Sequence, residues 1–196
     1  MCGRYYVDDE TAREIEKIVE EIEGKVRRTS LTGDIYPTQE APVLVRKNQK
    51  VSLRWQRWGF PRWNKKGVIF NSRSETVLEK TMFRESILHR RAVIPCAGFY
   101  EWNRSKEKVS FRRQDSPVIF MGGFFNLWEG EERFVIMTTE ANPFVAPVHS
   151  RMPLVLERDE IGDWLLDDET FQTRIGQRPV VLKKHQLYEQ ETFKFI

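Results

Sequence analysis

The sequence is poor in the residues on which several protein classes depend. It has 2 cysteines and 3 histidines in 196 residues, too few for a disulfide framework, and no cysteine–histidine spacing typical of zinc sites is present. No apolar run approaches the roughly 20 residues of a membrane-spanning helix. No charged segment followed by an apolar one forms a secretory leader at the start. We therefore expect a protein of the reducing cytoplasm, without a metal site and without a membrane partner.

An excess of one charge is also missing. Lys and Arg number 32 against 29 Asp and Glu, which gives a formal net charge of +3. Binding to nucleic acid would therefore depend on local clusters of positive residues, since the chain as a whole is only mildly basic. A length of 196 residues favours a single domain, 1–196, with enough chain to bury a core. We expect it to be a monomer.

The hydrophobic pattern predicts one long helix and many short strands. The helix covers residues 8–24, with acidic residues in its first turn and an apolar stripe at helical spacing. The stripe consists of Ala12, Ile15, Ile18, Val19 and Ile22, and Gly24 ends the helix. Strands rich in Val, Ile and aromatic residues are predicted at 41–46, 50–55, 67–71, 91–95, 98–102, 109–113, 117–125 and 133–139.

Two further short helices are predicted at 81–88 and 157–166. Strands and helices do not alternate regularly, which argues against a parallel sheet with crossover helices. The fold class is therefore predicted as α+β, with a mainly antiparallel, barrel-like β-sheet and a few peripheral helices.

The segment "RWQRWGFPRWNKKG" (54–67) alternates aromatic residues with cations. Aromatic rings that stack on bases, beside cations that meet phosphates, are typical of surfaces that bind single-stranded nucleic acid. The same pattern also fits core tryptophans next to a solvated charged face. The break at Gly59 and Pro61 places Trp63 on a loop, which favours a surface role for that residue.

The segment "FNSRSET" (70–76) places Asn71 and Arg73 where a predicted strand ends. Side chains two residues apart point to the same face of a strand, so this pair is a candidate for holding a sugar and a phosphate. The alternative is a capped turn in which Ser74 begins a helix.

Two candidate proton carriers follow. Glu101 lies among aromatic residues of the predicted strand "GFYEW", where burial would raise its pKa into the range useful for proton transfer. The alternative is a strand-end glutamate that faces water. His149, in "APVHSRMPLVL", lies in a loop near Arg151 and is suited to exchange protons near neutral pH, although an ordinary surface histidine would look the same.

Cys2 stands one residue from the start of the sequence. Chain ends are usually poorly ordered, which makes a purely structural role for this cysteine unattractive. A chemical role is more attractive, because removal of Met1 would leave a free amine and a thiol on the same residue.

In this order, "MCGRY", "WGF" with "NSRSET", "RAVIPCAGFYEW" and "HSRMPLVL" resemble the SOS response-associated peptidase (SRAP) family, from residue 1 to about residue 156. The resemblance implies a DNA-damage protein that reacts with abasic sites in single-stranded DNA and forms a covalent crosslink through its N-terminal cysteine. It also implies removal of Met1, by the chain itself or by an aminopeptidase, and association with the nucleoid if the source is bacterial.

The resemblance assigns roles to individual residues. Cys2 becomes the nucleophile, and its catalytic companions are Asn71, Glu101 and His149. The DNA-backbone contacts become Arg4, Arg73 and Arg151, with Trp63 as a neighbour that stacks on a base. The sequence departs from the family pattern before "PTQ", where Asp34 and Tyr36 replace the usual Asn and a small residue.

The chemistry of the lesion supports these roles. A ring-opened abasic sugar is an aldehyde, and a free α-amine with a pKa of about 7.7–8.0 is neutral often enough to form a Schiff base with it. The thiol of the same residue then closes a five-membered thiazolidine, a step favoured by proximity. His149 would protonate the sugar ring oxygen, Glu101 would move protons at the amine, and Asn71 would hold the N-terminus or the sugar. The reaction requires no metal and no cofactor.

Two alternative functions remain at this point. An N-terminal-nucleophile amidotransferase also opens on "MCG", but the sequence has neither of the segments, similar to "GRRPL" and "NGEIYN", that hold glutamine in such enzymes. A non-covalent single-strand binding module would use the aromatic and cationic loop alone. In that case a change of Cys2 would not alter DNA retention after denaturation.

Overall fold

The computed structural model describes residues 2–23, 32–64, 66–176 and 181–186. Its centre is a closed barrel, because β12 pairs with both β11 and β4 and so completes a ring of strands. All pairings in the ring are antiparallel except that of β12 with β4. The ring consists of β3 (Glu40–Lys47), β4 (Lys50–Trp58), β8 (Arg91–Cys96), β11 (Ile119–Trp128) and β12 (Glu131–Glu140).

Three short strands extend the barrel at its edges. The strands β7 and β13 pair with β12, and β14 pairs with β11. Their bounds are Asn71–Arg73 for β7, Arg151–Pro153 for β13 and Val155–Leu156 for β14. These edge strands matter for the site, because two of them bring residues from distant parts of the sequence to the same strand, β12.

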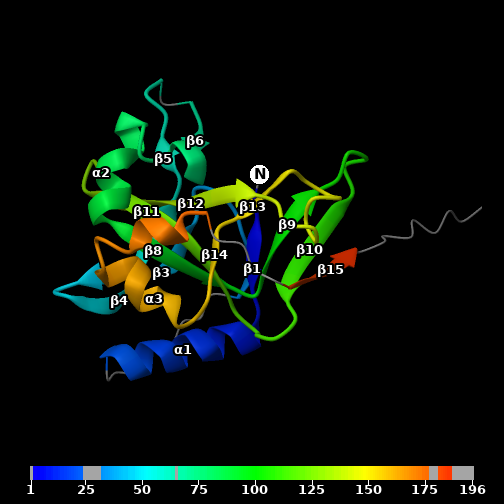
Figure 1. The fold of residues 1–196 in the computed structure, drawn as a ribbon, viewed down its shortest axis with the longest axis horizontal. Helices are drawn as coiled ribbons and strands as arrows, with labels where there is room; N and C mark the ends of the chain where they lie inside the picture. Colours follow the sequence, from blue (N-terminus) through cyan, green and yellow to red (C-terminus); the bar gives the residue numbers. More distant parts are fainter. Residues whose placement is uncertain (1, 24–31, 65, 177–180, 187–196) are drawn as a thin grey trace, which may run out of the picture.

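A second, fully antiparallel sheet has the order β15-β10-β9-β1-β2. In Figure 1, β1 stands between the barrel and the outer strands β9 and β10. The bounds are β1 (Tyr5–Val7), β2 (Gly33–Ile35), β9 (Gly98–Trp102), β10 (Lys108–Arg113) and β15 (Leu182–Gln186). The two sheets are joined by the chain itself, since β8 of the barrel continues after one residue as β9.

A small hairpin stands out from the top of the molecule in Figure 1. It consists of β5 (Phe60–Pro61) and β6 (Val68–Ile69), which pair only with each other in the described part of the chain. Gly59 at its base has φ +107°, and a Cβ there would lie 2.8 Å from the side chain of Val68. Glycine therefore lets the chain turn from β4 into the hairpin.

The helices lie outside the sheets (Figure 1). The predicted long helix is α1 (Asp9–Glu23), and its residues Ala12, Ile15 and Ile18 are buried. The side chains of Val19 and Ile22, and Gly24, lie outside what the structure describes. The other helices are η1 (Ser74–Thr76), α2 (Thr81–His89), α3 (Glu160–Leu166) and α4 (Phe171–Arg174). No helix among the described residues is long and apolar enough to cross a membrane.

The predicted fold class is confirmed: the protein is α+β, with a mainly antiparallel barrel and few peripheral helices. The strand predicted at 67–71 is divided between β6 and β7, because the chain leaves the hairpin and joins the barrel edge at Phe70. The aromatic segment 54–67 is also divided. Trp58 and Phe60 are fully buried in the core, whereas Trp63 is 93 % exposed.

Candidate active site around Cys2

Cys2 lies just before β1 and is completely buried. Its Sγ–H donates to the carbonyl oxygen of Arg4 over 3.6 Å. Burial raises the pKa of the Cys2 thiol well above its ordinary value, and the negative charge of Glu101 raises it further. At neutral pH the residue is therefore a thiol, and it needs a proton acceptor close by when it acts as a nucleophile.

Asn71 is positioned by β7, which pairs in parallel with β12. Ser72 is buried and the side chains alternate along the strand, so Asn71 and Arg73 share the other face. The amide Nδ2 of Asn71 donates to the carbonyl oxygen of Cys2 over 2.8 Å. The other amide atom, Oδ1, is buried and has no hydrogen-bond partner among the described residues. Asn71 thus holds Cys2 and keeps one acceptor unused.

Glu101 lies on β9, and only 1 % of its surface is exposed. Burial raises its pKa to about 7. The interpretation of Glu101 as a glutamate facing water is therefore wrong. A carboxyl group with this pKa is close to half protonated at neutral pH, so it can accept or donate a proton.

His149 comes from the loop between β12 and β13, whose ends are joined by a hydrogen bond from Ala141 N–H to the Ser150 carbonyl over 3.0 Å. Its Nδ1 lies 4.0 Å from Oε1 of Glu101. The same Nδ1 lies 3.0 Å from the backbone N of Arg151 and 3.1 Å from its carbonyl oxygen, so it can accept from the N–H when unprotonated and donate to the carbonyl when it carries a proton. Burial lowers the pKa of His149 below its ordinary value. The structure thus pairs the two candidate proton carriers.

The arginines predicted to contact DNA have different surroundings. Arg73 is exposed, and its side chain forms no hydrogen bond or ion pair within the described part of the chain. The guanidinium of Arg151 is held by both carboxylate oxygens of Glu75, over 2.6 and 2.8 Å. That of Arg4 pairs with Asp34 over 3.4 Å. Arg4 and Arg151 form ion pairs with carboxylates, whereas Arg73 acts on Glu75 only through its charge, which lowers the pKa of that carboxyl group after the contribution of Arg151.

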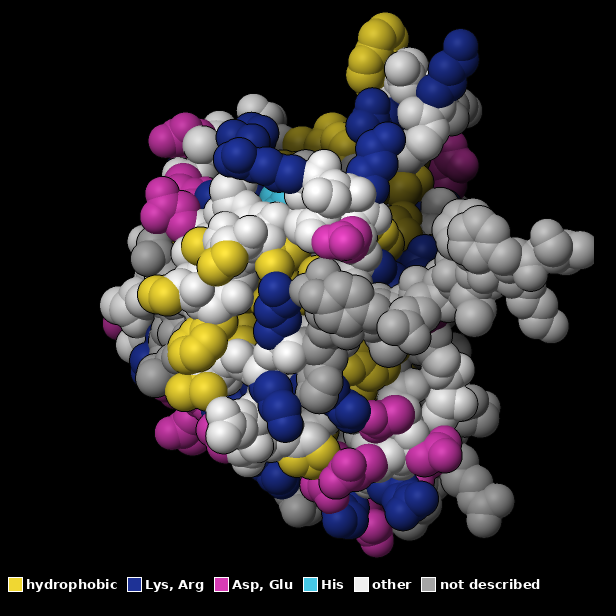
Figure 2. All heavy atoms as spheres, turned by 90° about the vertical axis from the view of Figure 1, so that its right-hand side faces the viewer, with side chains coloured by type: hydrophobic (Ala, Val, Ile, Leu, Met, Phe, Trp, Pro, Cys, Tyr) yellow, Lys and Arg dark blue, Asp and Glu magenta, His cyan; other side chains and the backbone are white. Residues whose placement is uncertain are grey.

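Trp63 lies at the far end of the β5–β6 hairpin, with Arg62 and Lys66 as described neighbours in the sequence. Figure 2 shares its vertical axis with Figure 1, so the projection at its top is this hairpin, and it carries hydrophobic, Lys and Arg side chains. The position of Trp63 agrees with the predicted surface role. The side chain is available for stacking, although no distance connects it to Cys2.

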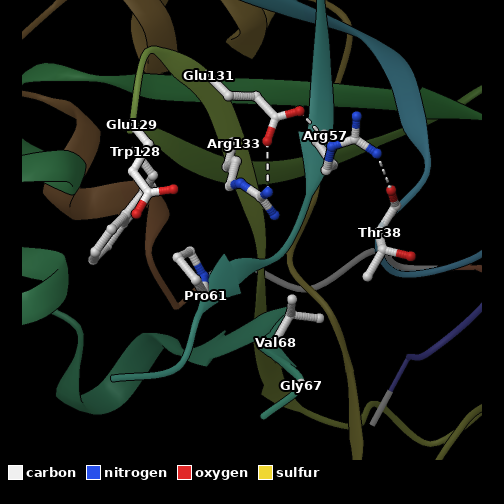
Figure 3. A pocket seen from close by; sticks show the side chains of 9 residues that line it. All are labelled: Thr38, Arg57, Pro61, Gly67, Val68, Trp128, Glu129, Glu131 and Arg133. Atoms are coloured by element: carbon white, nitrogen blue, oxygen red, sulfur yellow. Dashed lines mark hydrogen bonds and ion pairs between the residues drawn. The ribbon is translucent and has the colours of Figure 1, made fainter. Parts of the chain in front are cut away.

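Two hollows flank the hairpin. One, of about 710 Å³, is lined by Asn71 and Arg73 of the candidate site together with Lys80 and the first residues of α2. The other, of about 620 Å³, lies at the base of the hairpin (Figure 3). There Arg57 and Arg133 converge on the carboxylate of Glu131. The two arginines of the second hollow are therefore already paired with a carboxylate of the protein. The first hollow is the one that borders the candidate site, because Asn71 lines it.

Sequence reasoning missed two residues of this region. The hydroxyl group of Tyr5 is buried without a described partner, and burial, followed by the charges of Cys96 and Cys2, raises its pKa well above the ordinary value. Glu75 binds Arg151, and this hydrogen bond lowers the pKa of the Glu75 carboxyl. Neither residue stands out in the sequence, because a buried hydroxyl and a distant ion pair leave no local pattern. Within the described ranges, no group of three or more His, Cys, Asp or Glu residues is placed to hold a metal ion.

Comparison with known proteins places this geometry in context. The chain is 32 % identical over 146 residues to "Abasic site processing protein YoaM" of Bacillus subtilis, a match that covers 67 % of the chain and 64 % of that protein. It is 30 % identical over 182 residues to "Abasic site processing protein YoqW" of the same organism, covering 84 % and 80 %. The chain therefore spans slightly less than two thirds of YoaM.

The fold recurs in a crystal structure of a protein from Bordetella bronchiseptica, with a TM-score of 0.77 at 19 % identity, over 95 % of this chain and 99 % of that one. The family model described as SOS response associated peptidase (SRAP) matches residues 1–192. The motifs that carried the sequence resemblance lie within this range. Among their residues, Asn71 and Glu101 interact with Cys2, and His149 lies next to Glu101. The protein belongs to the SOS response associated peptidase (SRAP) family.

Proposed function

We propose that the protein recognises abasic sites in single-stranded DNA and binds them covalently as a thiazolidine through Cys2, after the bond between Met1 and Cys2 has been cleaved. Such an adduct would shield the lesion. The names of the relatives YoaM and YoqW support the class of substrate. The observation that carries the proposal is the hydrogen bond of 2.8 Å from Asn71 to the Cys2 carbonyl, beside a Glu101–His149 pair at 4.0 Å.

The first step opens the sugar ring. The C1′ hydroxyl loses its proton, the ring oxygen gains one, and C1′ becomes the carbon of an aldehyde. His149 supplies the proton to the ring oxygen. Its lowered pKa makes the protonated imidazole a less abundant but stronger acid, which suits a short-lived donor.

The second step joins protein and DNA. The neutral amine of Cys2 attacks C1′, and one proton moves from nitrogen to oxygen to give the carbinolamine. The second N–H proton then moves to the same oxygen, and water leaves to give the neutral Schiff base. Glu101 serves as the carrier of these protons, because a pKa of about 7 populates both of its forms. The unused Oδ1 of Asn71 is suited to accept an N–H of the new amine, since Asn71 already holds the same residue by its carbonyl.

The third step closes the ring. The sulfur of Cys2 forms a bond to C1′, and the thiol proton ends on the nitrogen of the former imine. No oxidant or reductant is needed, and water is the only molecule released. Both nucleophiles belong to one residue, so the closure is intramolecular and strongly favoured. The raised pKa of the thiol keeps it protonated and therefore unreactive until the imine is in place.

Release of Met1 belongs to the same proposal. Glu101 is the described carboxyl group beside Cys2 that is suited to assist attack of water on the Met1 carbonyl. Intact mass spectrometry of chains made in a cell-free system without aminopeptidase tests this step. Wild type should lose the mass of one methionine and Glu101→Ala should retain it. Equal retention in both would assign the cleavage to another enzyme.

The main experiment mixes the processed protein with a single-stranded oligonucleotide that carries one abasic site. A slower band on a denaturing gel is expected, with the summed mass of protein and DNA less one water. The intact oligonucleotide is the matched control. A chain that binds both oligonucleotides but forms no denaturation-resistant band with either would be a non-covalent single-strand binding module, and the proposal would be wrong.

A further inference from the structure

The side chain of Arg4 lies on the opposite face of the second sheet from the buried Tyr5 that follows it. On this outer face its guanidinium carbon lies 4.4 Å from the centre of the Tyr36 ring and 5.4 Å from that of Trp102. Both distances fall within the range of a cation–π contact. The Tyr100 ring lies at 5.9 Å, so the predicted phosphate contact is packed against three aromatic rings.

The charge of Arg4 is compensated at the same place. Asp34 pairs with its Nη1 over 3.4 Å, and the hydroxyl group of Tyr100 donates to the other oxygen of that carboxylate over 3.0 Å. A phosphate that approached Arg4 would also approach Asp34, and the repulsion offsets the attraction. Tyr36 meanwhile is 38 % exposed. Lys108 adds a cation farther along the cluster, with its Nζ 4.7 Å from the centre of the Tyr100 ring. At Tyr36 itself, the surface presents an aromatic ring beside a cation that is already paired with a carboxylate.

This surface adjoins the reactive residue through two strands. The carbonyl oxygen of Arg4 accepts both the thiol of Cys2 over 3.6 Å and the backbone N–H of Tyr100 over 3.0 Å. On β9, the side chains of Tyr100 and Trp102 share one face, and that of Glu101, between them in the sequence, points to the other. The link to the reactive residue is therefore Arg4, two residues from Cys2, and a nucleotide next to the one that reaches Cys2 has this aromatic face within the span of neighbouring residues.

We propose that Tyr36, supported from behind by Arg4, is a stacking subsite for the unpaired base next to the abasic site. This inference rests on the proposed function. Arg4 and Asp34 act as positioning residues that fix the ring, and Arg4 does not bind a phosphate. Every base has a π-face, so the subsite stacks on the base beside the lesion without sequence specificity.

The first test measures stacking directly. The probe is a single strand with a tetrahydrofuran residue, which has no C1′ hydroxyl and cannot form an aldehyde, flanked on either side by 2-aminopurine. Wild type should quench the fluorescence of 2-aminopurine on one side. Tyr36→Ala should abolish this quenching and weaken binding about 5- to 150-fold, while Tyr36→Phe should retain both. Leu127→Ala, at a residue 62 % exposed on β11, is the control for loss of an exposed apolar side chain. Unchanged quenching and affinity in Tyr36→Ala would overturn the proposal.

The second test asks what Arg4 contacts. Each phosphate neutralised on a single strand contributes about 0.7 to the slope of log affinity against log salt. Arg73→Gln should reduce the slope by about that amount, and Arg4→Gln should leave it unchanged. A reduction of about 0.7 in Arg4→Gln would make Arg4 a phosphate contact and contradict the inference.

The two proposals fail in different ways. If an authentic abasic strand gives no covalent adduct, but quenching on the tetrahydrofuran strand still depends on Tyr36, the chemistry is wrong and the subsite stands. If the adduct forms and the quenching is indifferent to Tyr36, the subsite alone is wrong.

Discussion

The centre around Cys2 and the β5–β6 hairpin differ in burial, and under the proposed function they have different roles. Cys2 and Glu101 are 0 % and 1 % exposed, whereas Trp63 is 93 % exposed. Burial is what moves the pKa values of Cys2, Glu101 and His149 away from their ordinary values. The comparison teaches that burial gives the groups of the centre the shifted pKa values that proton transfer uses, while an exposed side chain such as Trp63 is suited to stack on a base of a DNA strand.

The largest expected effect comes from removing the nucleophile. Cys2→Ala keeps the α-amine after release of Met1 but has no thiol to close the thiazolidine, so the stable adduct should be lost completely. Only a labile imine should form, and borohydride should trap it. Denaturing gels with and without borohydride measure the difference. A heat-stable adduct of Cys2→Ala without reductant would show that the ring is not formed by this thiol.

The next effect separates the two proton carriers within the centre. Each general acid or base is worth about 10²–10⁴ in rate. His149→Ala should slow crosslinking to an abasic site but not to a ring-less aldehyde analogue, whereas Glu101→Ala should slow both. Single-turnover rates on chains already without Met1 are compared. Equal slowing of His149→Ala on both substrates would assign His149 a positioning role instead of ring opening.

The pH profile sharpens the role of Glu101. If its carboxylate accepts the proton of the amine, then below about pH 7, the pKa of Glu101, the rate should fall by up to a further tenfold per unit, in addition to the fall caused by protonation of the α-amine. Glu101→Gln should lose this inflection and keep the one that belongs to the α-amine, near 7.7–8.0. Rates between pH 5 and 9 measure both. An unchanged profile in Glu101→Gln would remove Glu101 from the proton path.

Glu101→Gln is also expected to fold. The folded chain binds the proton of Glu101 more tightly than the unfolded chain, so the free energy of unfolding falls as the pH rises from about 4.3 towards 7. A glutamine has no such ionisation. Thermal unfolding at pH 8 should therefore show Glu101→Gln at least as stable as wild type, which serves as the control for its kinetic effect.

On the hairpin, Trp63→Ala should weaken binding and leave the chemistry intact. Loss of one stacked base corresponds to about a 5- to 150-fold drop in affinity for single strands. Fluorescence anisotropy measures the affinity, and the crosslinking rate at saturating DNA should not change. A slower rate at saturation, with unchanged affinity, would place Trp63 in the catalytic centre and break the division between the two regions.

The smallest effect concerns Glu75, at the border of the centre. Glu75→Gln removes the negative charge that holds Arg151, so Arg151 gains freedom to meet a phosphate. An exposed ion pair is worth about 0–1 kcal/mol, so we expect affinity for single strands to rise by at most about fivefold, with a steeper salt dependence. A fall in affinity would mean that Glu75 is needed to aim Arg151.

The four predicted catalytic residues lie in motifs that are local in the sequence. The unusual place of Cys2, the carboxyl group of Glu101 among aromatic residues, and the loop position of His149 were visible there. The spacing of Asn71 and Arg73 predicted a shared strand face, and β7 has this alternation. What the sequence did not contain is which of these motifs meet. Pairing of β7 and β13 with β12 brings the motifs of Asn71 and His149 to one strand, and pairing of β1 with β9 brings the motifs of Cys2 and Glu101 together.

The sequence by itself determined the α+β class, the long amphipathic helix and the central barrel strands, because hydrophobic periodicity and β-branched runs are local properties. Tertiary structure alone decided that Trp58 is core and Trp63 is surface, and that Arg4 and Arg151 are paired with carboxylates while Arg73 is not. It also decided the pKa of Glu101. Burial and ion pairing depend on residues far apart in the chain that only the closed barrel and the adjoining sheet bring into contact.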